Sequence, residues 1–312
     1  MDELPRVTLV TPSLNQGEFI AHTIESVLAQ NYPNLDYVIM DGGSTDDTLS
    51  IIRRYESDSR LTWYSELDNG QAHAINKAFR HTSGVILGWL NSDDVFIGQP
   101  VRESVVYFEN HPEAMVVYGQ VIEIDSTGKR FDDRIFGDTF DPVRALSDVR
   151  TPIPQPGSFF RRSLWNQTGN LREDLRYSLD TDFWIRASRH GQLHFMPGIR
   201  AGFRRHEQAK TVSGVLQTWL EDKKLAEWIF QQPDTYPDLT AKRRLIESNL
   251  AWGMSLQHGD TDKARRYAWE AFVKSPLRLR QVAMLVRLLD LQFGTRFSKR
   301  LGGLWRSVKR FS

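Results

Sequence analysis

Residues 84–94 read Gly84-Val85-Ile86-Leu87-Gly88-Trp89-Leu90-Asn91-Ser92-Asp93-Asp94. An apolar run bounded by glycine and polar residues is typical of a central parallel strand that is covered on both faces. Two adjacent carboxylates, Asp93 and Asp94, follow this strand at its carboxyl end. Because one or two carboxylates together with phosphate oxygens satisfy Mg²⁺ or Mn²⁺, we expect a metal site here. The alternative is a solvated loop or a helix N-cap, since Ser-Asp-Asp is also a capping sequence.

Two earlier segments have the same organisation, a strand followed by polar residues. Residues 6–15 read Arg-Val-Thr-Leu-Val-Thr-Pro-Ser-Leu-Asn, and residues 36–48 read Asp-Tyr-Val-Ile-Met-Asp-Gly-Gly-Ser-Thr-Asp-Asp-Thr. The ligands of open α/β sheets bind in the crevice outside the carboxyl ends of the strands. We therefore expect Thr11, Asp41 and Asp93 to point into one crevice.

Four segments, taken together and in this order, resemble family 2 glycosyltransferases of the GT-A fold. They are residues 10–15, residues 39–48, Asp68-Asn69-Gly70-Gln71 and Asn91-Ser92-Asp93-Asp94. The resemblance runs from Pro5 to about Ser213. It implies an α/β fold, in which a GT-A-like nucleotide-sugar-binding domain with a mostly parallel central sheet precedes a helical C-terminal region. It also implies inverting transfer of a sugar from a nucleotide-sugar donor to an acceptor hydroxyl, without a covalent enzyme intermediate.

The resemblance assigns roles to the polar residues at the strand ends. Asp41 matches the aspartate that binds the nucleotide base, and the donor is expected to be a UDP-, GDP- or dTDP-sugar. Asp94 matches the last carboxylate of an Asp-x-Asp-type metal motif, which reads Asn-Ser-Asp-Asp here and leaves the direct ligand open between Asp93 and Asp94. Donor contacts are expected from Thr11, Ser13, Asn15, Asp41, Ser44, Asp68, Gly70, Lys77, Asn91 and Asp93.

The cofactor is expected to be Mn²⁺ or Mg²⁺. Ala201-Gly202-Phe203-Arg204-Arg205-His206 resembles the family's late Arg-x-His segment, in which the histidine completes the metal or diphosphate site. The metal ligands are therefore expected to be Asp93, Asp94 and His206. A lone histidine is otherwise more often a surface or packing residue.

The reaction also requires a base that removes the proton of the acceptor hydroxyl, and one carboxylate is enough. Leu179-Asp180-Thr181-Asp182-Phe183-Trp184-Ile185-Arg186 resembles the family's Glu-Asp-x-x-x-Trp-x-Arg segment, whose second acid is the catalytic base. Asp180 falls on that acid, while Leu179 replaces the usual glutamate. The alternative is that Asp180 and Asp182 are acids of a helix N-terminus. Gln155 lies in a segment that resembles the family's acceptor-side loop.

Other enzyme classes fit less well. The Gly-x-Gly-x-x-Gly of dinucleotide-binding proteins is missing after the first strand, and a phosphate-cradling Gly-Lys-Ser or Gly-Lys-Thr loop is also absent. Two alternatives stay open: a catalytically silent GT-A-fold scaffold in a polysaccharide-assembly complex, and a nucleotidyltransferase. Fold membership alone does not exclude the scaffold.

Composition bears on where the protein works. The 312 residues include no cysteine, so a disulfide framework and a thiolate nucleophile are excluded. Neither a secretory signal nor an apolar stretch near the ~20 residues that span a bilayer is evident. We expect a cytoplasmic protein, peripheral on the inner face of the cytoplasmic membrane, that uses glycan or lipid-linked acceptors of cell-surface polysaccharide or lipopolysaccharide synthesis.

Charge and periodicity divide the chain into three predicted parts. Residues 1–213 form the catalytic domain, residues 214–291 a helical region, and residues 292–312 a basic amphipathic tail. From Lys274 onward there are ten Lys or Arg and one Asp, a net charge of +9, which leaves −8 for the first 273 residues of a chain of net charge +1. A basic amphipathic helix is typical of an element that binds an anionic membrane surface or a partner. No nucleic-acid-binding motif accompanies the charge.

Overall fold

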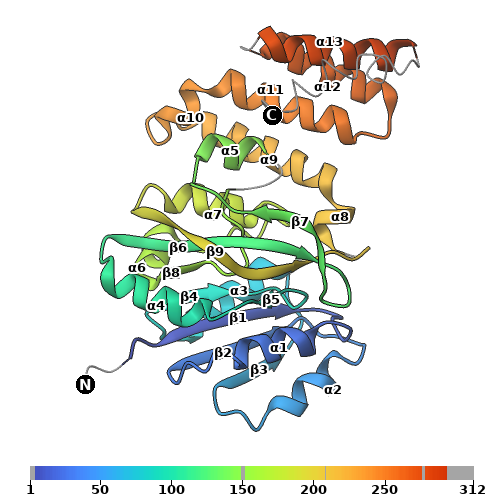
Figure 1. Cartoon of the computed structure of the whole chain (residues 1–312). Helices are drawn as coiled ribbons and strands as arrows, with labels where there is room; N and C mark the ends of the chain where they lie inside the picture. The colour runs from blue at the N-terminus through green and yellow to red at the C-terminus, as the bar shows by residue number, and fades with distance from the viewer. Residues whose placement is uncertain (1–3, 149–151, 208, 276–277, 294–312) are drawn as a thin grey trace. The chain divides into compact units, whose positions relative to one another are not determined.

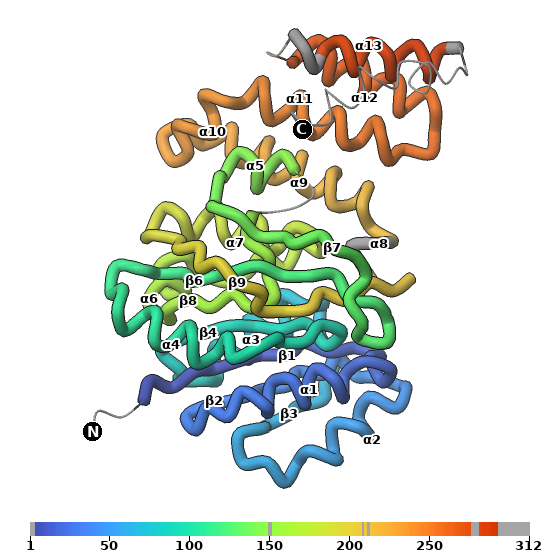
Figure 2. The backbone as a smooth tube through the Cα atoms, in the orientation of Figure 1, coloured from blue at the N-terminus to red at the C-terminus, as the bar shows by residue number. Residues whose placement is uncertain are grey.

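The computed structural model describes residues 4–148, 152–207, 209–275 and 278–293. The chain divides into two compact units, which are described separately below. The first contains residues 1–141 and 150–213, and the second contains residues 142–149 and 214–312. Figure 1 shows the elements of both units, and the tube in Figure 2 follows the path of the backbone.

A single sheet runs through the first unit. Its strands lie in the order β3-β2-β1-β4-β8-β6-β9-β5, with β7 paired to β6. The pairs among β3, β2, β1 and β4 are parallel, and β6 and β9 are also parallel, whereas β8 is antiparallel to both β4 and β6. The strands are β1 (Val7–Ser13), β2 (Leu35–Asp41), β3 (Leu61–Ser65), β4 (Ile86–Trp89), β5 (Val95–Phe96), β6 (Ala114–Ile124), β7 (Arg130–Phe136), β8 (Phe159–Arg161) and β9 (Gln192–Arg204).

Helices cover both faces of this sheet. Because side chains alternate along a strand, Leu9 and Ile39 join one buried cluster while Val10 and Val38 join the other. The first cluster includes α1 (Ile20–Leu28), α2 (Thr48–Ile52) and α4 (Pro100–Asn110), and the second includes α3 (Gln71–His81), α6 (Arg162–Thr168) and α7 (Leu179–Ala187). The short helix α8 (Lys210–Ser213) ends the unit. The predicted α/β class with a sheet covered on both faces is confirmed.

The strand predicted within residues 84–94 is shorter than its apolar run. β4 begins at Ile86, because Val85 precedes the paired residues and is 54% exposed. Trp89 at the end of β4 is buried and stacks on Trp184 of α7, with ring centroids 5.7 Å apart. The polar residues Asn91–Asp94 then leave the sheet at the carboxyl end of β4, as the sequence predicts.

The second unit is helical among its described residues. It contains α9 (Val215–Phe230), α10 (Pro237–Ala241), α11 (Arg243–Gln257), α12 (Thr261–Lys274) and α13 (Arg278–Phe293). The helix α5 (Pro142–Ser147) belongs to this unit although its residues lie within the range 1–213. In the described part of the chain, no helix has both the length and the apolar character needed to cross a bilayer. The predicted basic tail lies outside the described residues from position 294 onward.

Candidate active site

Three parallel strands end at one edge of the sheet and bring the predicted donor residues to that edge. β1 and β2 pair with Ser13 opposite Asp41, and β4 pairs with β1 with Trp89 opposite Val10. The polar segments 14–17, 42–48 and 90–94 follow these three strand ends. Because all three strands run in the same direction, the segments lie at the same edge, the usual position of a ligand in such a sheet.

Asp41 is buried at the end of β2, and its carboxylate is held by uncharged donors. Oδ2 accepts hydrogen bonds from the backbone N–H groups of Gly43 (3.0 Å) and Ser44 (2.9 Å) and from the Ser65 hydroxyl (2.7 Å). Oδ1 accepts from the Ser44 hydroxyl. These donors offset the cost of burying the carboxylate. Each carboxylate oxygen accepts about two hydrogen bonds, so Oδ1 retains capacity for an N–H of a nucleobase.

Asn15 joins the loops that follow β1 and β2. Its backbone N–H donates to the Ser44 hydroxyl (2.7 Å), and its side-chain Oδ1 accepts from the backbone N–H of Thr45 (2.9 Å). Asn15 has a φ of 52°, in the left-handed region that asparagine tolerates better than most residues. In this structure Asn15 and Ser44 therefore hold the two loops together.

Thr11 and Ser13 lie within β1 and differ in what their hydroxyls contact. The Thr11 hydroxyl is fully buried and accepts a hydrogen bond from the Tyr37 hydroxyl (3.1 Å), so it belongs to the interior of the sheet. The Ser13 hydroxyl is also buried, but it has no hydrogen-bond partner among the described residues. Ser13 is therefore the one of the two with capacity for a ligand.

Asp68 lies against the backbone that follows β2. A Cβ atom on Gly42 would lie 2.8 Å from Asp68 Oδ2, so only glycine leaves room for this carboxylate. Asp68 Oδ1 accepts from the backbone N–H of Gly70 (2.7 Å), whose φ of 113° precedes the start of α3. Lys77, which was predicted to contact the donor, forms an ion pair with Glu66.

The three predicted metal ligands are not equivalent. Asp93 Oδ2 lies 3.1 Å from His206 Nε2, and both side chains are partly exposed, at 22% and 10%. Asp94 is fully buried, and its Oδ1 accepts from the backbone N–H of Arg204 (2.9 Å). Burial, followed by the charge of Asp93, raises the pKa of Asp94 well above its ordinary value. The structure therefore brings Asp93 and His206 together and directs the Asp94 carboxylate into the protein.

Arg204 holds this segment in place from β9. Its Nε donates to the carbonyl of Asp93 (2.7 Å), and its Nη1 donates to the carbonyls of Asp125 and Ser126 (both 2.9 Å) in the turn between β6 and β7. Burial lowers the pKa of the Arg204 guanidinium, although the neighbouring acids oppose that shift. The ring of Phe19 contacts both Arg204 and His206.

A chain of hydrogen bonds links the segment Asn91–Asp94 to α8. Asn91 Nδ2 lies 3.4 Å from Asp94 Oδ2, and Asn91 Oδ1 accepts from Gln71 Nε2 (2.7 Å). Lys210 donates from Nζ to Gln71 Oε1 (2.8 Å). The charge of Lys210 also lowers the pKa of Asp180. Lys210 thus interacts both with Gln71 of this chain of hydrogen bonds and with the predicted base.

Asp180 lies in the first turn of α7 and is half-buried. Burial raises its pKa to about 6, while a hydrogen bond from the backbone N–H of Thr181 (2.9 Å) and the charge of Lys210 oppose the rise. A carboxylate with such a pKa is ionised at neutral pH and remains basic enough to accept a proton from a hydroxyl during its attack. The structure thus gives Asp180 the properties that a general base requires.

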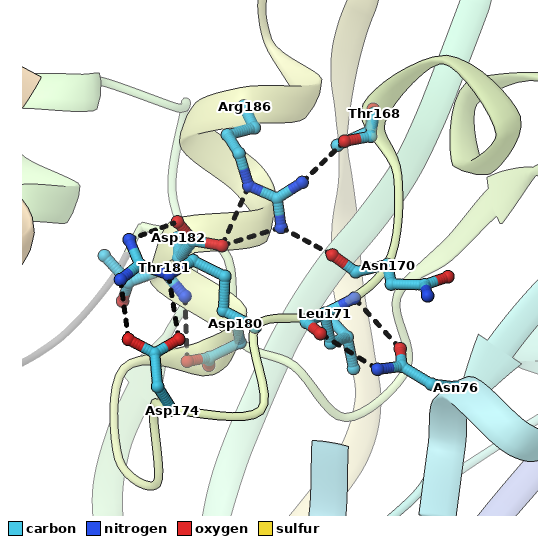
Figure 3. A network of polar contacts seen from close by, with 10 residues as sticks. Asn76, Thr168, Asn170, Leu171, Asp174, Asp180, Thr181, Asp182 and Arg186 are labelled. Carbon is cyan, nitrogen blue, oxygen red and sulfur yellow. Dashed lines mark hydrogen bonds and ion pairs between the residues drawn. The ribbon is translucent and has the colours of Figure 1, made fainter. Parts of the chain in front are cut away.

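Asp182, one half-turn further along α7, has a different environment. Its side chain is fully buried, and its Oδ2 accepts from Arg186 Nε (2.8 Å) and Nη2 (2.6 Å). Arg186 also donates to the backbone carbonyls of Thr168 (2.6 Å) and Asn170 (3.0 Å). Figure 3 shows this ion pair joining α7 to the segment that follows α6. The second aspartate is therefore structural, whereas the sequence offered it only as an acid of the helix N-terminus.

The same segment is fixed a second time from α3. The buried Asn76 donates from Nδ2 to the carbonyl of Leu171 and accepts at Oδ1 from the N–H of Leu171, both at 2.9 Å (Figure 3). This pair of bonds reproduces the pairing of two backbone amides. The segment around residues 168–171 is consequently held both by Arg186 of α7 and by Asn76 of α3.

Comparison with known proteins identifies this arrangement. The sequence profile for glycosyl transferase family 2 matches residues 8–169, more than half of the chain and the part that contains all the strands from β1 to β8. The chain belongs to glycosyl transferase family 2. Asp180 and His206 lie beyond the matched range.

Relatives of this glycosyltransferase match about 60% of the chain. An uncharacterized glycosyltransferase of Mycobacterium tuberculosis is 31% identical over 194 residues, which cover 60% of this chain and 71% of that protein. The chondroitin synthase of Escherichia coli is 27% identical over 192 residues, 61% of this chain and 28% of that one. A PGL/p-HBAD biosynthesis glycosyltransferase of Mycobacterium bovis is 29% identical over 185 residues, 58% and 69% of the two chains.

Solved structures share the fold at lower sequence identity. S. aureus TarS in complex with UDP-GlcNAc has a TM-score of 0.61 at 16% identity and covers 92% of this chain and 87% of that one. The mannosyltransferase PcManGT from Pyrobaculum calidifontis, in complex with GDP-Man and Mn²⁺, has a TM-score of 0.61 at 18% identity, with 97% and 85% covered. The GT-A fold of this glycosyltransferase is thereby confirmed.

Gln155 contacts the end of β4 in this glycosyltransferase. It is 7% exposed and donates from Nε2 to the carbonyl of Trp89, while its Oε1 is buried without a partner among the described residues. Trp89 lies two residues before Asn91, the first residue of the segment Asn91–Asp94. Gln155 therefore fixes the end of β4.

Three residues of this site were not among the predicted site residues: Gln71, Arg204 and Lys210. Gln71 and Arg204 fall inside segments that carry the family resemblance, so their positions were available from the sequence. Lys210 lies beyond those segments, and nothing in the sequence indicated that it acts on Asp180. Its role depends on how the chain folds back after β9.

Proposed function

We propose that this glycosyltransferase is an inverting, metal-dependent enzyme that moves a sugar from a nucleoside-diphosphate sugar to an acceptor hydroxyl. The observation that carries the proposal is the contrast within α7. Asp180 is half-buried with a pKa raised to about 6, whereas Asp182 forms an ion pair with Arg186. One free carboxylate at this position suits a general base in a single displacement.

In this proposal Asp180 accepts the proton of the acceptor hydroxyl as its oxygen attacks the anomeric carbon of the donor sugar. The bond from the anomeric carbon to the diphosphate oxygen breaks in the same step, so the configuration at that carbon inverts. Because an oxygen nucleophile gains acidity as it forms the bond, a base of moderate strength is sufficient. The charge of Lys210 lowers the pKa of Asp180 and so favours its ionised form.

The donor side of the site supports a nucleoside diphosphate. Asp41 Oδ1 and Asp68 are carboxylate acceptors for N–H and O–H groups of a nucleoside, and the Ser13 hydroxyl is buried without a partner among the described residues. The related folds TarS and PcManGT were solved with UDP-GlcNAc and GDP-Man. We propose a UDP-, GDP- or dTDP-sugar as donor, with Asp41 as the residue that contacts the base.

The metal-facing residues fit a hard divalent cation. Asp93 and His206 supply two partly exposed donors 3.1 Å apart, and diphosphate oxygens and water would complete the coordination. When bound, Mn²⁺ or Mg²⁺ would neutralise charge on the departing diphosphate. Asp94 is buried on Arg204, so we propose Asp93 as the direct ligand and Asp94 as the acid that positions the segment. A divalent ion in this place is further supported by the Mn²⁺ complex of PcManGT.

The proposal extends to the chemical class of the acceptor. The relatives include a chondroitin synthase and a PGL/p-HBAD biosynthesis glycosyltransferase. We propose a glycan or lipid-linked acceptor in cell-surface polysaccharide or lipopolysaccharide synthesis. Attachment to an anionic membrane through the basic C-terminal segment stays a prediction from sequence.

A donor screen tests the proposal. The full chain is incubated with Mn²⁺ or Mg²⁺, an acceptor extract and each of a set of UDP-, GDP- and dTDP-sugars, and nucleoside diphosphate is detected. We expect release of nucleoside diphosphate from one donor. This release should be abolished in Asp93→Ala and unchanged in Asp234→Asn, a control at an exposed residue. Absence of release from every donor, with nucleotide binding confirmed by a metal-dependent rise in melting temperature, would favour a silent scaffold instead.

A further inference from the structure

A second group of metal-binding side chains lies in the first unit, away from the donor site. His111 follows α4, Glu113 precedes β6, and His194 lies near the start of β9. One ligand atom of each residue lies within 4.8 Å of the other two. His111 Nδ1 is 3.2 Å from Glu113 Oε1, and the two imidazole rings have centroids 5.8 Å apart.

The topology places this group at the edge of the sheet opposite to Asp93. β6 is antiparallel to β8, and β8 is antiparallel to β4, so β6 runs in the same direction as β4. Asp93 follows the carboxyl end of β4, whereas Glu113 directly precedes the amino end of β6. β9 is parallel to β6 and also begins at that edge. The group is therefore separate from the catalytic crevice.

From this geometry we propose that His111, Glu113 and His194 bind a divalent transition metal of the Zn²⁺ class. Two imidazoles and one carboxylate are donors that Zn²⁺ accepts, with the fourth position left to water. Ligand atoms about 2.0–2.2 Å from a tetrahedral ion lie roughly 3.4 Å from one another. The pair at 3.2 Å already has this spacing. The third, His194, would have to exchange its contact with Gln192 for the ion, and the exposed Glu113 can rotate to meet it.

Neighbouring groups orient the two imidazoles. The Tyr107 hydroxyl lies 3.1 Å from His194 Nδ1, and Gln192 Oε1 lies 2.9 Å from His194 Nε2. The Tyr107 ring also stacks on His111, with centroids 4.2 Å apart and planes at 26°. A hydrogen bond to one ring nitrogen is the usual way in which a protein fixes the tautomer and direction of a metal-ligating histidine. Tyr107 would thus act as an outer partner on Nδ1, and Nε2 would bind the ion in place of Gln192.

The backbone beneath the group is fixed as well. Arg161 of β8 donates to the carbonyls of Ala114 (2.8 Å), Phe108 (2.9 Å) and His111 (3.3 Å), which holds the turn between α4 and β6. The pairing of β6 with β9 sets His194 opposite Val117. A site that is built on such fixed segments requires little reorganisation on binding. The bound ion would cross-link the end of α4 to the start of β9.

Zn²⁺ titration of the full chain carrying Asp93→Ala and His206→Ala tests this proposal, because these changes remove the metal-facing residues of the donor site. We expect one Zn²⁺ per chain, a rise in melting temperature on binding, and visible absorption bands of a tetrahedral site when Co²⁺ replaces Zn²⁺. His111→Ala or His194→Ala in this background should weaken binding by more than about tenfold, and Tyr107→Phe by about tenfold. His190→Ala, which removes a nearby exposed histidine outside the group, should bind as the parent does.

Two results would overturn the proposal. One is the absence of saturable Zn²⁺ binding tighter than about 1 mM. The other is binding that His111→Ala and His194→Ala leave unchanged. Circular dichroism of the metal-free variants checks that they fold. Glu113→Gln keeps the size of the side chain while removing its charge, so its effect on Zn²⁺ affinity remains interpretable if an alanine variant unfolds.

Discussion

At the scale of single residues, two aspartates of α7 differ because of what surrounds them. Asp182 meets the guanidinium of Arg186 and is neutralised by it, whereas Asp180 is half-buried beside a backbone N–H and a more distant lysine. Desolvation without a close cation raises the pKa of a carboxyl group. The sequence motif assigns the base to Asp180, and the folded structure adds that Asp182 forms a buried ion pair while Asp180 does not.

The pH dependence of transfer follows from the raised pKa of Asp180. Because the base must be ionised, kcat/KM should rise with pH through about 6 and level off above it. Lys210→Met should move this limb to higher pH, since the charge of Lys210 lowers the pKa of Asp180. Asp180→Asn should reduce the rate by about 10²- to 10⁴-fold, the usual contribution of a general base, while nucleotide still binds. A pH profile without a limb near 6 would argue against Asp180 as the base.

The same pKa predicts that Asp180 lowers stability. A carboxyl whose pKa is higher in the folded than in the unfolded state binds a proton more readily when folded, so stability falls as pH rises from about 4 to about 6 and stays low above that. The two-unit difference corresponds to about 3 kcal/mol. Asp180→Asn should therefore increase the free energy of unfolding at pH 8 by up to this amount, and the gain should disappear near pH 4. Urea denaturation at the two pH values measures it, and equal stability at pH 8 would contradict the burial of the charge.

At the scale of elements, the start of α7 depends on side chains that reach it from other segments. Asp182 and Arg186 join the helix to the carbonyls after α6, and Asn76 of α3 holds the same segment (Figure 3). The strands β1, β2 and β4 were predicted from local apolar runs followed by polar residues. These cross-connections depend on which elements become neighbours, and a local pattern does not contain that information.

Asp182→Asn is the matched counterpart of Asp180→Asn, two residues away and with the same change of atoms. Removing one partner of a buried ion pair leaves the other charge uncompensated and typically costs 3–5 kcal/mol. We expect the free energy of unfolding to fall by about that amount at pH 8, opposite in sign to the effect of Asp180→Asn. If both substitutions stabilised the protein, the assignment of Asp182 as structural would be wrong.

The turn after β2 gives a prediction for donor binding. A side chain at Gly42 would come within 2.8 Å of Asp68 Oδ2, so Gly42→Ala must displace this carboxylate. Because the contact is with the end of a side chain and not with backbone, the fold should tolerate the change. We expect weaker nucleotide binding with little change in melting temperature. Binding equal to that of the wild type, measured by calorimetry, would show that Asp68 does not need its present position.

At the scale of the whole molecule, the sequence predicted the class of fold and the edge of the sheet at which the site lies. It did not predict that Asp94 turns inward onto Arg204, that Lys77 pairs with Glu66, or that α5 belongs to the helical unit. The contact between Asp94 and Arg204 of β9 depends on the order of strands beyond β4, where β8 intervenes between β4 and β6. Residues far apart in the sequence set that order, so no short motif reports it.

The stereochemistry of the product tests the central claim most directly. The claim is a single displacement in which Asp180 acts as a base and forms no bond to the sugar. With the donor identified, proton NMR of the first-formed product should show an anomeric configuration inverted relative to that of the donor sugar. Retention of configuration would contradict the account, because it requires two successive displacements or a same-face transfer that one general base does not provide.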